Sequence, residues 1–130
     1  MPAPDEIDLE RVVCRVADLE ALGARAFTLG GGDWPLRGFV VLSSGRVRGY
    51  VNRCPHAGHP LDLKPHHFLT HDRALIVCAS HGALFEKEAG HCLAGPCAGR
   101  TLTPIPLMTV GSLVLLAPQA DVAALAAVAT

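Results

Sequence analysis

The sequence predicts an all-β protein that ends in one short helix. Short runs of β-branched and aliphatic residues alternate with turns rich in Gly, Pro and Ser, a pattern typical of antiparallel strands. Two of these runs flank the tripeptide Ser43-Ser44-Gly45 and predict a β-hairpin. Apolar residues recur at helical spacing over more than one turn only in the Ala-rich C-terminal tail.

The composition indicates one small globular domain. The chain has 130 residues, of which 50% are hydrophobic and 5% aromatic, so Val, Leu, Ile and Ala must build its core. A chain of this length buries roughly two-thirds of its unfolded surface and does not need a metal merely to fold. The formal net charge is −1 and there is no long basic run, which argues against a nucleic-acid-binding surface.

The sequence also favours a cytoplasmic location. No stretch approaches about 18 consecutive apolar residues, so no membrane span is expected. The N-terminal residues are acidic and polar and lack the apolar segment of a secretory signal. In such a chain the five cysteines are expected to be reduced thiols or metal ligands.

Four strands are predicted in the N-terminal half of the chain, at residues 11–16, 25–29, 37–42 and 47–51. A helical turn at 18–22 is expected between the first two strands, with Gly23 as its stop. The last two strands form the predicted hairpin.

Loops and brief strands alternate in the middle of the chain. Residues 53–62 and 90–99 contain Gly and Pro and are predicted to be loops. Residues 75–77 form a short buried strand that leads into Cys78, and residues 82–85 lead away from it.

The run 102–110 is predicted to be an edge strand at best. Pro104 and Pro106 interrupt it, and proline cannot donate a hydrogen bond to a neighbouring strand. Residues 112–117 are expected to close the sheet.

The Ala-rich tail, residues 118–130, is expected to be helical. Asp121 is its predicted N-cap, and Val122, Leu125 and Val128 share one face. About ten residues are too few for a stable isolated helix, so this face should dock on the protein's own sheet or on another subunit.

Two short motifs each bring one cysteine and one histidine together. They are Cys54-Pro55-His56 and Cys78-Ala79-Ser80-His81, and each follows a predicted strand and enters a turn. Two thiolates and two imidazoles are the ligand set of a Rieske-type [2Fe–2S] cluster, in which two His replace two Cys on one iron. A tetrahedral Cys₂His₂ zinc module is the alternative, but zinc fingers usually group Cys with Cys and His with His.

The ligand motifs and their surroundings resemble the small bacterial Rieske ferredoxin-like proteins. Four segments carry the resemblance, and they are Cys54–Gly58, Pro60–Asp62, Cys78–Phe85 and Gly90–Pro96. The resemblance implies an antiparallel β-sandwich over residues 1–117 with a small cluster-binding subdomain, whose loops are at about 53–62, 78–85 and 90–99. It implies one [2Fe–2S] cluster, with Cys54 and Cys78 on the inner iron and His56 and His81 on the outer iron. The Gly95-Pro96 loop would cover the cluster from a third side.

The resemblance implies a one-electron carrier rather than an enzyme. Its partners would be a reductase that donates electrons and an oxygenase, or another redox enzyme, that accepts them. No small-molecule substrate is expected. The alternative function is that of a redox subunit bound permanently to a larger reductase. A complete oxygenase would also need a mononuclear iron held by two His and a carboxylate, and too few residues are left to build that site.

The sequence departs from the respiratory Rieske proteins at two places, and the first bears on the reduction potential. Those proteins place Ser and Tyr hydroxyl groups after the second His, where this chain has Ala83 and Phe85. Without these donors a reduced cluster is less stabilised. We therefore expect a potential in the lower part of the Rieske range of roughly −150 to +300 mV. Those proteins also carry a disulfide between the ligand loops, and Gly58, His59 and Ala79 leave no cysteines for one.

The remaining candidate residues are given structural roles. His66, His67 and His71 are expected to be a polar surface connector rather than a second metal site, and His59 an exposed loop residue. Cys14 is expected in the core, and Cys92 and Cys97 as packing thiols. Trp34 is expected to be a packing residue. Glu86, Lys87 and Glu88 are expected to form a solvated turn without a chemical role.

Overall fold

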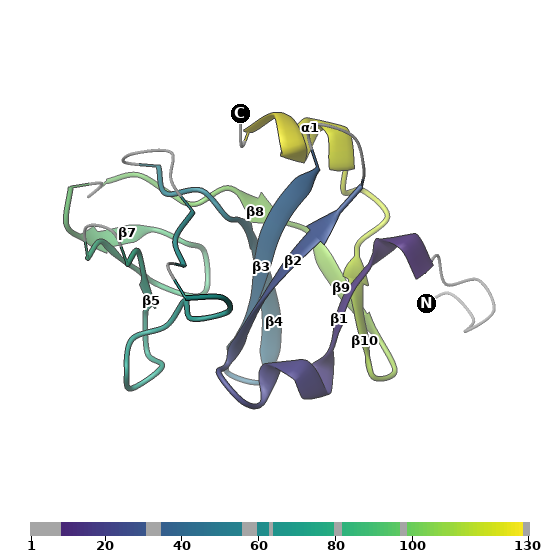
Figure 1. Cartoon of the computed structure of the whole chain (residues 1–130), viewed down its shortest axis with the longest axis horizontal. Helices are drawn as coiled ribbons and strands as arrows, with labels where there is room; N and C mark the ends of the chain where they lie inside the picture. Colours follow the sequence, from purple (N-terminus) through teal and green to yellow (C-terminus); the bar gives the residue numbers. More distant parts are fainter. Residues whose placement is uncertain are drawn as a thin grey trace.

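The computed structural model describes residues 9–30, 35–55, 60–62, 64–79, 82–96 and 99–128. These residues form three antiparallel sheets and one helix, which confirms the predicted fold class. Figure 1 shows a central sheet that contains β3, with a small sheet around β5 and β7 on its left and a terminal sheet around β9 and β10 on its right.

The central sheet contains the predicted hairpin. Its strand order is β2-β3-β4-β8, with bounds Ala24–Leu29, Leu36–Ser43, Arg46–Val51 and Pro104–Ile105. Ser44 and Gly45 join β3 to β4 with φ of 50° and 76°. Positive φ at both turn residues is typical of the tight turns that match the twist of paired strands.

Strand β3 is buried on both faces of the central sheet. Phe39 and Val41 belong to a core shared with the small sheet, whereas Leu36 and Val40 belong to a core shared with the terminal sheet. Neighbouring residues of a strand point to opposite faces. The continuous apolar run of β3 therefore separates two cores.

The terminal sheet completes the sandwich, with strand order β1-β10-β9 and bounds Val12–Arg15, Leu113–Leu116 and Leu107–Val110. A 3₁₀ turn at Val16–Leu19 follows β1, close to the helical turn predicted there. The last strand, β10, matches the run predicted at residues 112–117 and lies between β1 and β9.

The proline-interrupted run divides at Pro106. β8 pairs with β4 at one edge of the central sheet, and β9 pairs with β10 at one edge of the terminal sheet. The edge positions confirm the prediction made from Pro104 and Pro106. We did not predict that residues 102–110 would contribute one strand to each of two sheets.

The small sheet carries the ligand motifs and has the order β5-β6-β7, with bounds Ile76–Val77, Leu84–Phe85 and Cys92–Ala94. β5 and β6 match the predicted strand and return segment. The prediction that all of 90–99 is a loop was wrong, because β7 pairs with β6 inside it. Three residues beside glycines give too short a pattern to indicate a strand.

The C-terminal helix α1 spans Val122–Val128. Asp121 caps it, since its carboxylate accepts a hydrogen bond from the Ala124 N–H at 3.1 Å. Ala126 is buried in the core shared with the terminal sheet, and Val122 and Leu125 pack against it. The predicted docking on the chain's own sheet is therefore confirmed. In the part of the chain that the structure describes, no helix is long and apolar enough to cross a membrane.

Candidate metal centre

Cys54 and Cys78 lie in the same buried core. Cys54 follows β4, Cys78 follows β5 directly, and both side chains have 0% exposure. The described cysteines form no disulfide. Two thiols thus occupy the places that the sequence predicts for ligands. The other two predicted ligands, His56 and His81, are outside the described residues.

The second ligand loop is closed by its own backbone. The Cys78 N–H donates to the Ala83 carbonyl at 2.8 Å, and the Gly82 N–H donates to the Cys78 carbonyl at 2.8 Å. Gly82 has a φ of 71°, which glycine adopts without strain. These bonds fix both ends of the segment in which His81 stands in the sequence.

Leu61 connects the two ligand loops. Its N–H donates to Asn52 Oδ1 at 2.8 Å, and its carbonyl accepts from the Ala79 N–H at 2.9 Å. Leu61 is fully buried in the core that contains both cysteines. Hydrogen bonds in such surroundings are stronger than in water and costly to leave unmade. The relative position of the two loops is therefore fixed by a residue that is not itself a ligand.

A chain of polar groups extends this connection to the central sheet. Asn52 Nδ2 donates to Asp62 Oδ1 at 2.9 Å, and the His66 N–H donates to Asp62 Oδ2 at 3.3 Å. The His66 ring in turn accepts from the Ala26 N–H at 3.0 Å, on the edge strand β2. The prediction that His66 belongs to a mere surface connector was incomplete, because its ring caps a backbone group.

The described parts of the chain contain no group of three potential metal ligands. His59 lies outside the described residues.

The third loop packs against the second. Gly95 has a φ of 99°, and a Cβ at this position would lie 2.9 Å from Ala83 Cα. Only glycine allows the two backbones to approach so closely. Arg100, which follows this loop, donates from Nη1 to the Pro55 carbonyl at 2.7 Å. Gly95 therefore lies against the second ligand loop, and Arg100 contacts the first.

The other described cysteines are packing residues. Cys92 is buried in the core that contains both ligand loops, and its Sγ donates to the Ala94 carbonyl at 3.3 Å. Burial raises the pKa of Cys14 to about 11, so this thiol stays protonated at neutral pH. Both findings confirm the predictions. Cys97 and Trp34 lie outside the described residues.

The turn at Glu86, Lys87 and Glu88 is more than the solvated turn that the sequence indicates. Lys87 Nζ donates to the Leu42 carbonyl at 2.7 Å, and the Lys87 carbonyl accepts from the Tyr50 hydroxyl at 2.6 Å. Glu88 accepts from Ser43 Oγ and from Arg48 Nη2. The turn thus fastens the small sheet to the β3–β4 hairpin. Burial raises the pKa of Tyr50 to about 12, which keeps its hydroxyl a donor.

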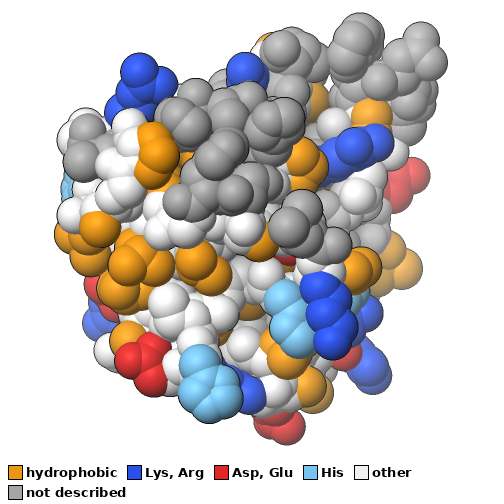
Figure 2. Space-filling model, turned by 60° about the vertical axis from the view of Figure 1, so that its left-hand side comes forward, with side chains coloured by type: hydrophobic (Ala, Val, Ile, Leu, Met, Phe, Trp, Pro, Cys, Tyr) orange, Lys and Arg blue, Asp and Glu red, His pale blue; other side chains and the backbone are white. Residues whose placement is uncertain are grey.

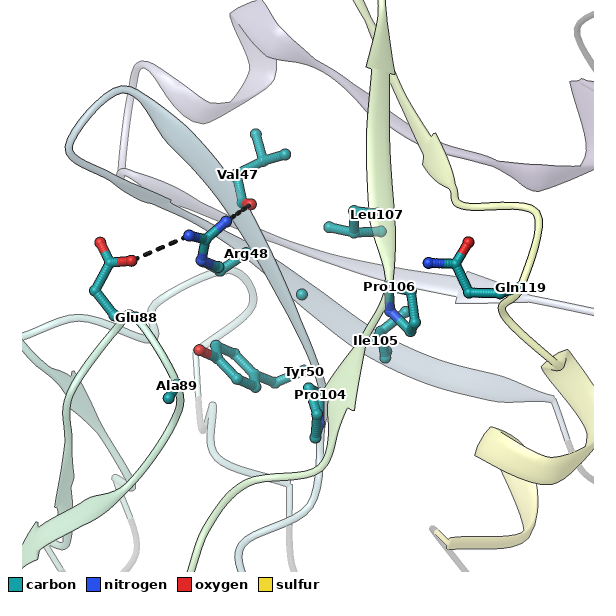
Figure 3. A pocket seen from close by; sticks show the side chains of 11 residues that line it. Val47, Arg48, Tyr50, Glu88, Ala89, Pro104, Ile105, Pro106, Leu107 and Gln119 are labelled. Atoms are coloured by element: carbon teal, nitrogen blue, oxygen red, sulfur yellow. Dashed lines mark hydrogen bonds and ion pairs between the residues drawn. The ribbon is translucent and has the colours of Figure 1, made fainter. Parts of the chain in front are cut away.

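A cavity of about 430 Å³ lies beside this turn. Figure 3 shows Arg48 between Glu88 and the Val47 carbonyl, and the Tyr50 hydroxyl directed toward the turn. Gln119 and the Pro104–Leu107 segment form the opposite wall. Neither Cys54 nor Cys78 lines this cavity. It is therefore separate from the candidate metal centre.

Comparisons with solved structures reveal the same fold. The ferredoxin of carbazole 1,9a-dioxygenase from Nocardioides aromaticivorans IC177 is 24% identical with a TM-score of 0.64, and the match covers 83% of this chain and 96% of that one. A Sphingomonas yanoikuyae B1 ferredoxin is 21% identical with a TM-score of 0.59, covering 81% and 94%.

A larger protein contains a similar domain. The terminal oxygenase of carbazole 1,9a-dioxygenase from N. aromaticivorans IC177 is 18% identical with a TM-score of 0.66, and the match covers 82% of this chain but 29% of that one. No curated protein sequence matches significantly. The family model of the Rieske [2Fe-2S] domain matches residues 10–115, which include both ligand motifs. The chain therefore belongs to the Rieske [2Fe-2S] domain family.

Proposed function

We propose that the chain is a one-electron carrier that holds one Rieske-type [2Fe–2S] cluster on Cys54, His56, Cys78 and His81. The family implies the cluster, and the chemistry of the donor set fits it, since thiolates and imidazoles are the ligands of a Rieske centre. When bound, such a cluster accepts and releases single electrons. The observation that carries the proposal is the full burial of Cys54 and Cys78 in one core, on loops joined through Leu61.

The chain's own residues suit this task in two ways. The burial of both cysteines keeps water from the sulfur side of the site. The hydrogen bonds of Leu61 and Ala83 hold the loops in place, so a change in charge should cause little rearrangement. Small rearrangement is what a site needs to accept and release an electron quickly.

The similar ferredoxin structures support an electron-carrier role. This chain covers 96% and 94% of two ferredoxin chains but 29% of the terminal oxygenase. One similar structure is described as a complex of reduced oxygenase and oxidised ferredoxin. We propose a reductase as the electron donor, an oxygenase or other redox enzyme as the acceptor, and the cytoplasm as the location. The family match disfavours the zinc module.

The domain boundaries are part of the proposal. Residues 1–117 would form the Rieske domain, with cluster-binding loops at about 53–62, 78–85 and 90–99, and residues 118–130 would be an appended tail. The end of the family match at residue 115 supports this division.

Analysis of purified protein tests the function. We expect iron and acid-labile sulfide in equal amounts, a red-brown colour, and a reversible one-electron wave in protein-film voltammetry. Colourless protein that contains zinc but no sulfide would overturn the proposal. Mixing the reduced protein with a candidate oxygenase then tests the transfer step.

A further inference from the structure

Leu93 is an exposed aliphatic residue in an unusual backbone position. Leu84 pairs with Ala94 while its neighbour Phe85 pairs with Cys92, so Leu93 is an extra residue in β7. Such a bulge redirects a side chain, and bulges are frequent next to functional sites. Leu93 is 56% exposed, and among the described residues the only other large apolar side chain so exposed is Leu9, at 75%.

The bulge lies beside the ligand loops. Leu93 lies two residues before Gly95 in the sequence. The backbone of Gly95 packs on Ala83 of the second ligand loop. The ligand-loop segments contain further exposed apolar residues, and they are Ala79, Ala94 and Pro96. Figure 2 turns the β5–β7 side of Figure 1 forward and shows hydrophobic side chains gathered on the left of this face, with Lys and Arg side chains around the periphery.

The ligand-loop segments themselves contain one more base than acids, although the whole chain has a net charge of −1. Segments 53–62, 78–85 and 90–100 contain two bases, Arg53 and Arg100, and one acid, Asp62. The Asp62 carboxylate accepts hydrogen bonds from the Asn52 side chain and the His66 N–H. Arg100 is exposed, and its contact with the Pro55 carbonyl holds its guanidinium beside the first ligand motif.

Building on the proposed electron-carrier function, we propose that Leu93 and Arg100 form the surface on which a redox partner protein docks. The partner would present an aliphatic recess for Leu93 and carboxylates beside it for Arg100. A single anchor that fills a recess supplies a large share of interface affinity. Complementary charge mainly speeds and orients the encounter. Docking here would bring the partner against the loops that hold the cluster.

A gold electrode that carries the proposed partner chemistry tests this surface. Its coating mixes methyl-terminated and carboxylate-terminated thiols, and a second electrode replaces the carboxylates with amines. The holoprotein concentration that gives half-maximal electroactive coverage is measured on both. The variants are Leu93→Ser and Arg100→Gln. The matched controls are Leu9→Ser, in a separate 3₁₀ turn at Leu9–Arg11 that precedes β1, and Arg46→Gln, at the first residue of β4.

We expect wild-type protein to prefer the carboxylate electrode. Leu93→Ser should raise the half-maximal concentration about fivefold at every salt concentration, the loss typical of removing an interface anchor. Arg100→Gln should raise it at low salt only, because about 1 M salt screens exposed charges. The controls should behave as wild type.

The experiment distinguishes failure of the docking surface from failure of the electron-carrier function. If wild type and both variants give equal waves and equal coverage on both electrodes, the docking surface is wrong and the electron carrier stands. If wild type gives no reversible one-electron wave on either electrode, the carrier function fails, and the docking surface fails with it.

Discussion

Asn52 is the side chain that joins the end of β4 to the connection between the ligand loops. Its Oδ1 accepts from Leu61 and its Nδ2 donates to Asp62, at 2.8 and 2.9 Å. The Leu61 N–H is buried, so it has no ready replacement for a lost acceptor. Neither Asn52 nor Leu61 was identified from the sequence. The available signal was a lone amide between a buried strand and the first ligand motif.

The variant Asn52→Ala should lose this connection. We expect the free energy of unfolding to fall by about 1–3 kcal/mol, the cost of an unsatisfied buried donor, and the cluster to bleach faster. Urea denaturation and the decay of visible absorbance measure the two effects. Gln119→Ala removes an exposed amide and is the control. Equal bleaching in both variants would show that Asn52 does not hold the loops.

Gly95 should tolerate no side chain. In Gly95→Ala the new Cβ would lie 2.9 Å from Ala83 Cα, in addition to the strain of the positive φ. Gly99→Ala is a matched control, because Gly99 has a φ of 87° but open space around it. We expect both variants to lose about 1 kcal/mol of stability from the backbone, and only Gly95→Ala to release its cluster rapidly. Similar cluster retention in the two variants would contradict close packing of the third loop.

Phe85 and Ala83 offer no hydroxyl group to a cluster, and both are fully buried. We expect Phe85→Tyr to raise the reduction potential, since a donor stabilises the more negative reduced state. A hydrogen bond stronger by about 1 kcal/mol on reduction corresponds to about 40 mV. Phe68→Tyr adds a hydroxyl elsewhere in the same core and should leave the potential unchanged. Voltammetry that gives equal potentials for Phe85→Tyr and wild type would disprove the role of this position.

Among the strands and helices, the short strands were the hardest to predict from the sequence. The β3–β4 hairpin was predicted because its turn residues and apolar runs are local signals. β7 was missed because its three residues are held by pairing with β6 and by a hydrogen bond from the Cys92 N–H to the Arg100 carbonyl. The local sequence around β7 does not indicate that β6 and Arg100 will be its hydrogen-bonding partners. The same reason explains why the anchoring role of the Glu88 turn was missed.

The Glu88 turn gives a prediction about pH. The hydrogen bond from Ser43 and the charge of Arg48 hold the pKa of Glu88 below its usual value of 4.5. A lowered carboxyl pKa stabilises the fold fully above the usual value, and this stabilisation is lost as the pH falls through the lowered value. We therefore expect wild type to be more stable than Glu88→Gln at pH 7, with the difference shrinking below about pH 4.5. Urea denaturation of both proteins at a series of pH values measures it. A difference that is independent of pH would refute the link.

At the scale of the whole molecule, the central sheet separates two cores with different tasks. On one side, Val40 and Val51 pack with the terminal sheet and the helix. On the other side, Phe39 stacks on Phe68 with ring centroids 4.2 Å apart, within the core that contains Cys54 and Cys78. The sandwich thus serves as a rigid base for the ligand loops. This arrangement followed from the family resemblance rather than from strand patterns, because the pairing of distant strands leaves no local signal.

In the proposed function, Cys54, His56, Cys78 and His81 together hold one cluster. Pulsed EPR of the dithionite-reduced protein tests it most directly, because it detects nitrogen atoms bound to a paramagnetic iron centre. We predict a one-electron-reduced [2Fe–2S] signal with couplings from two imidazole nitrogens. The signal should be unchanged in the control His91→Asn, because His91 is exposed and its Nδ1 hydrogen-bonds to the Thr101 hydroxyl at 2.9 Å. A [2Fe–2S] signal without nitrogen couplings would contradict the ligand set.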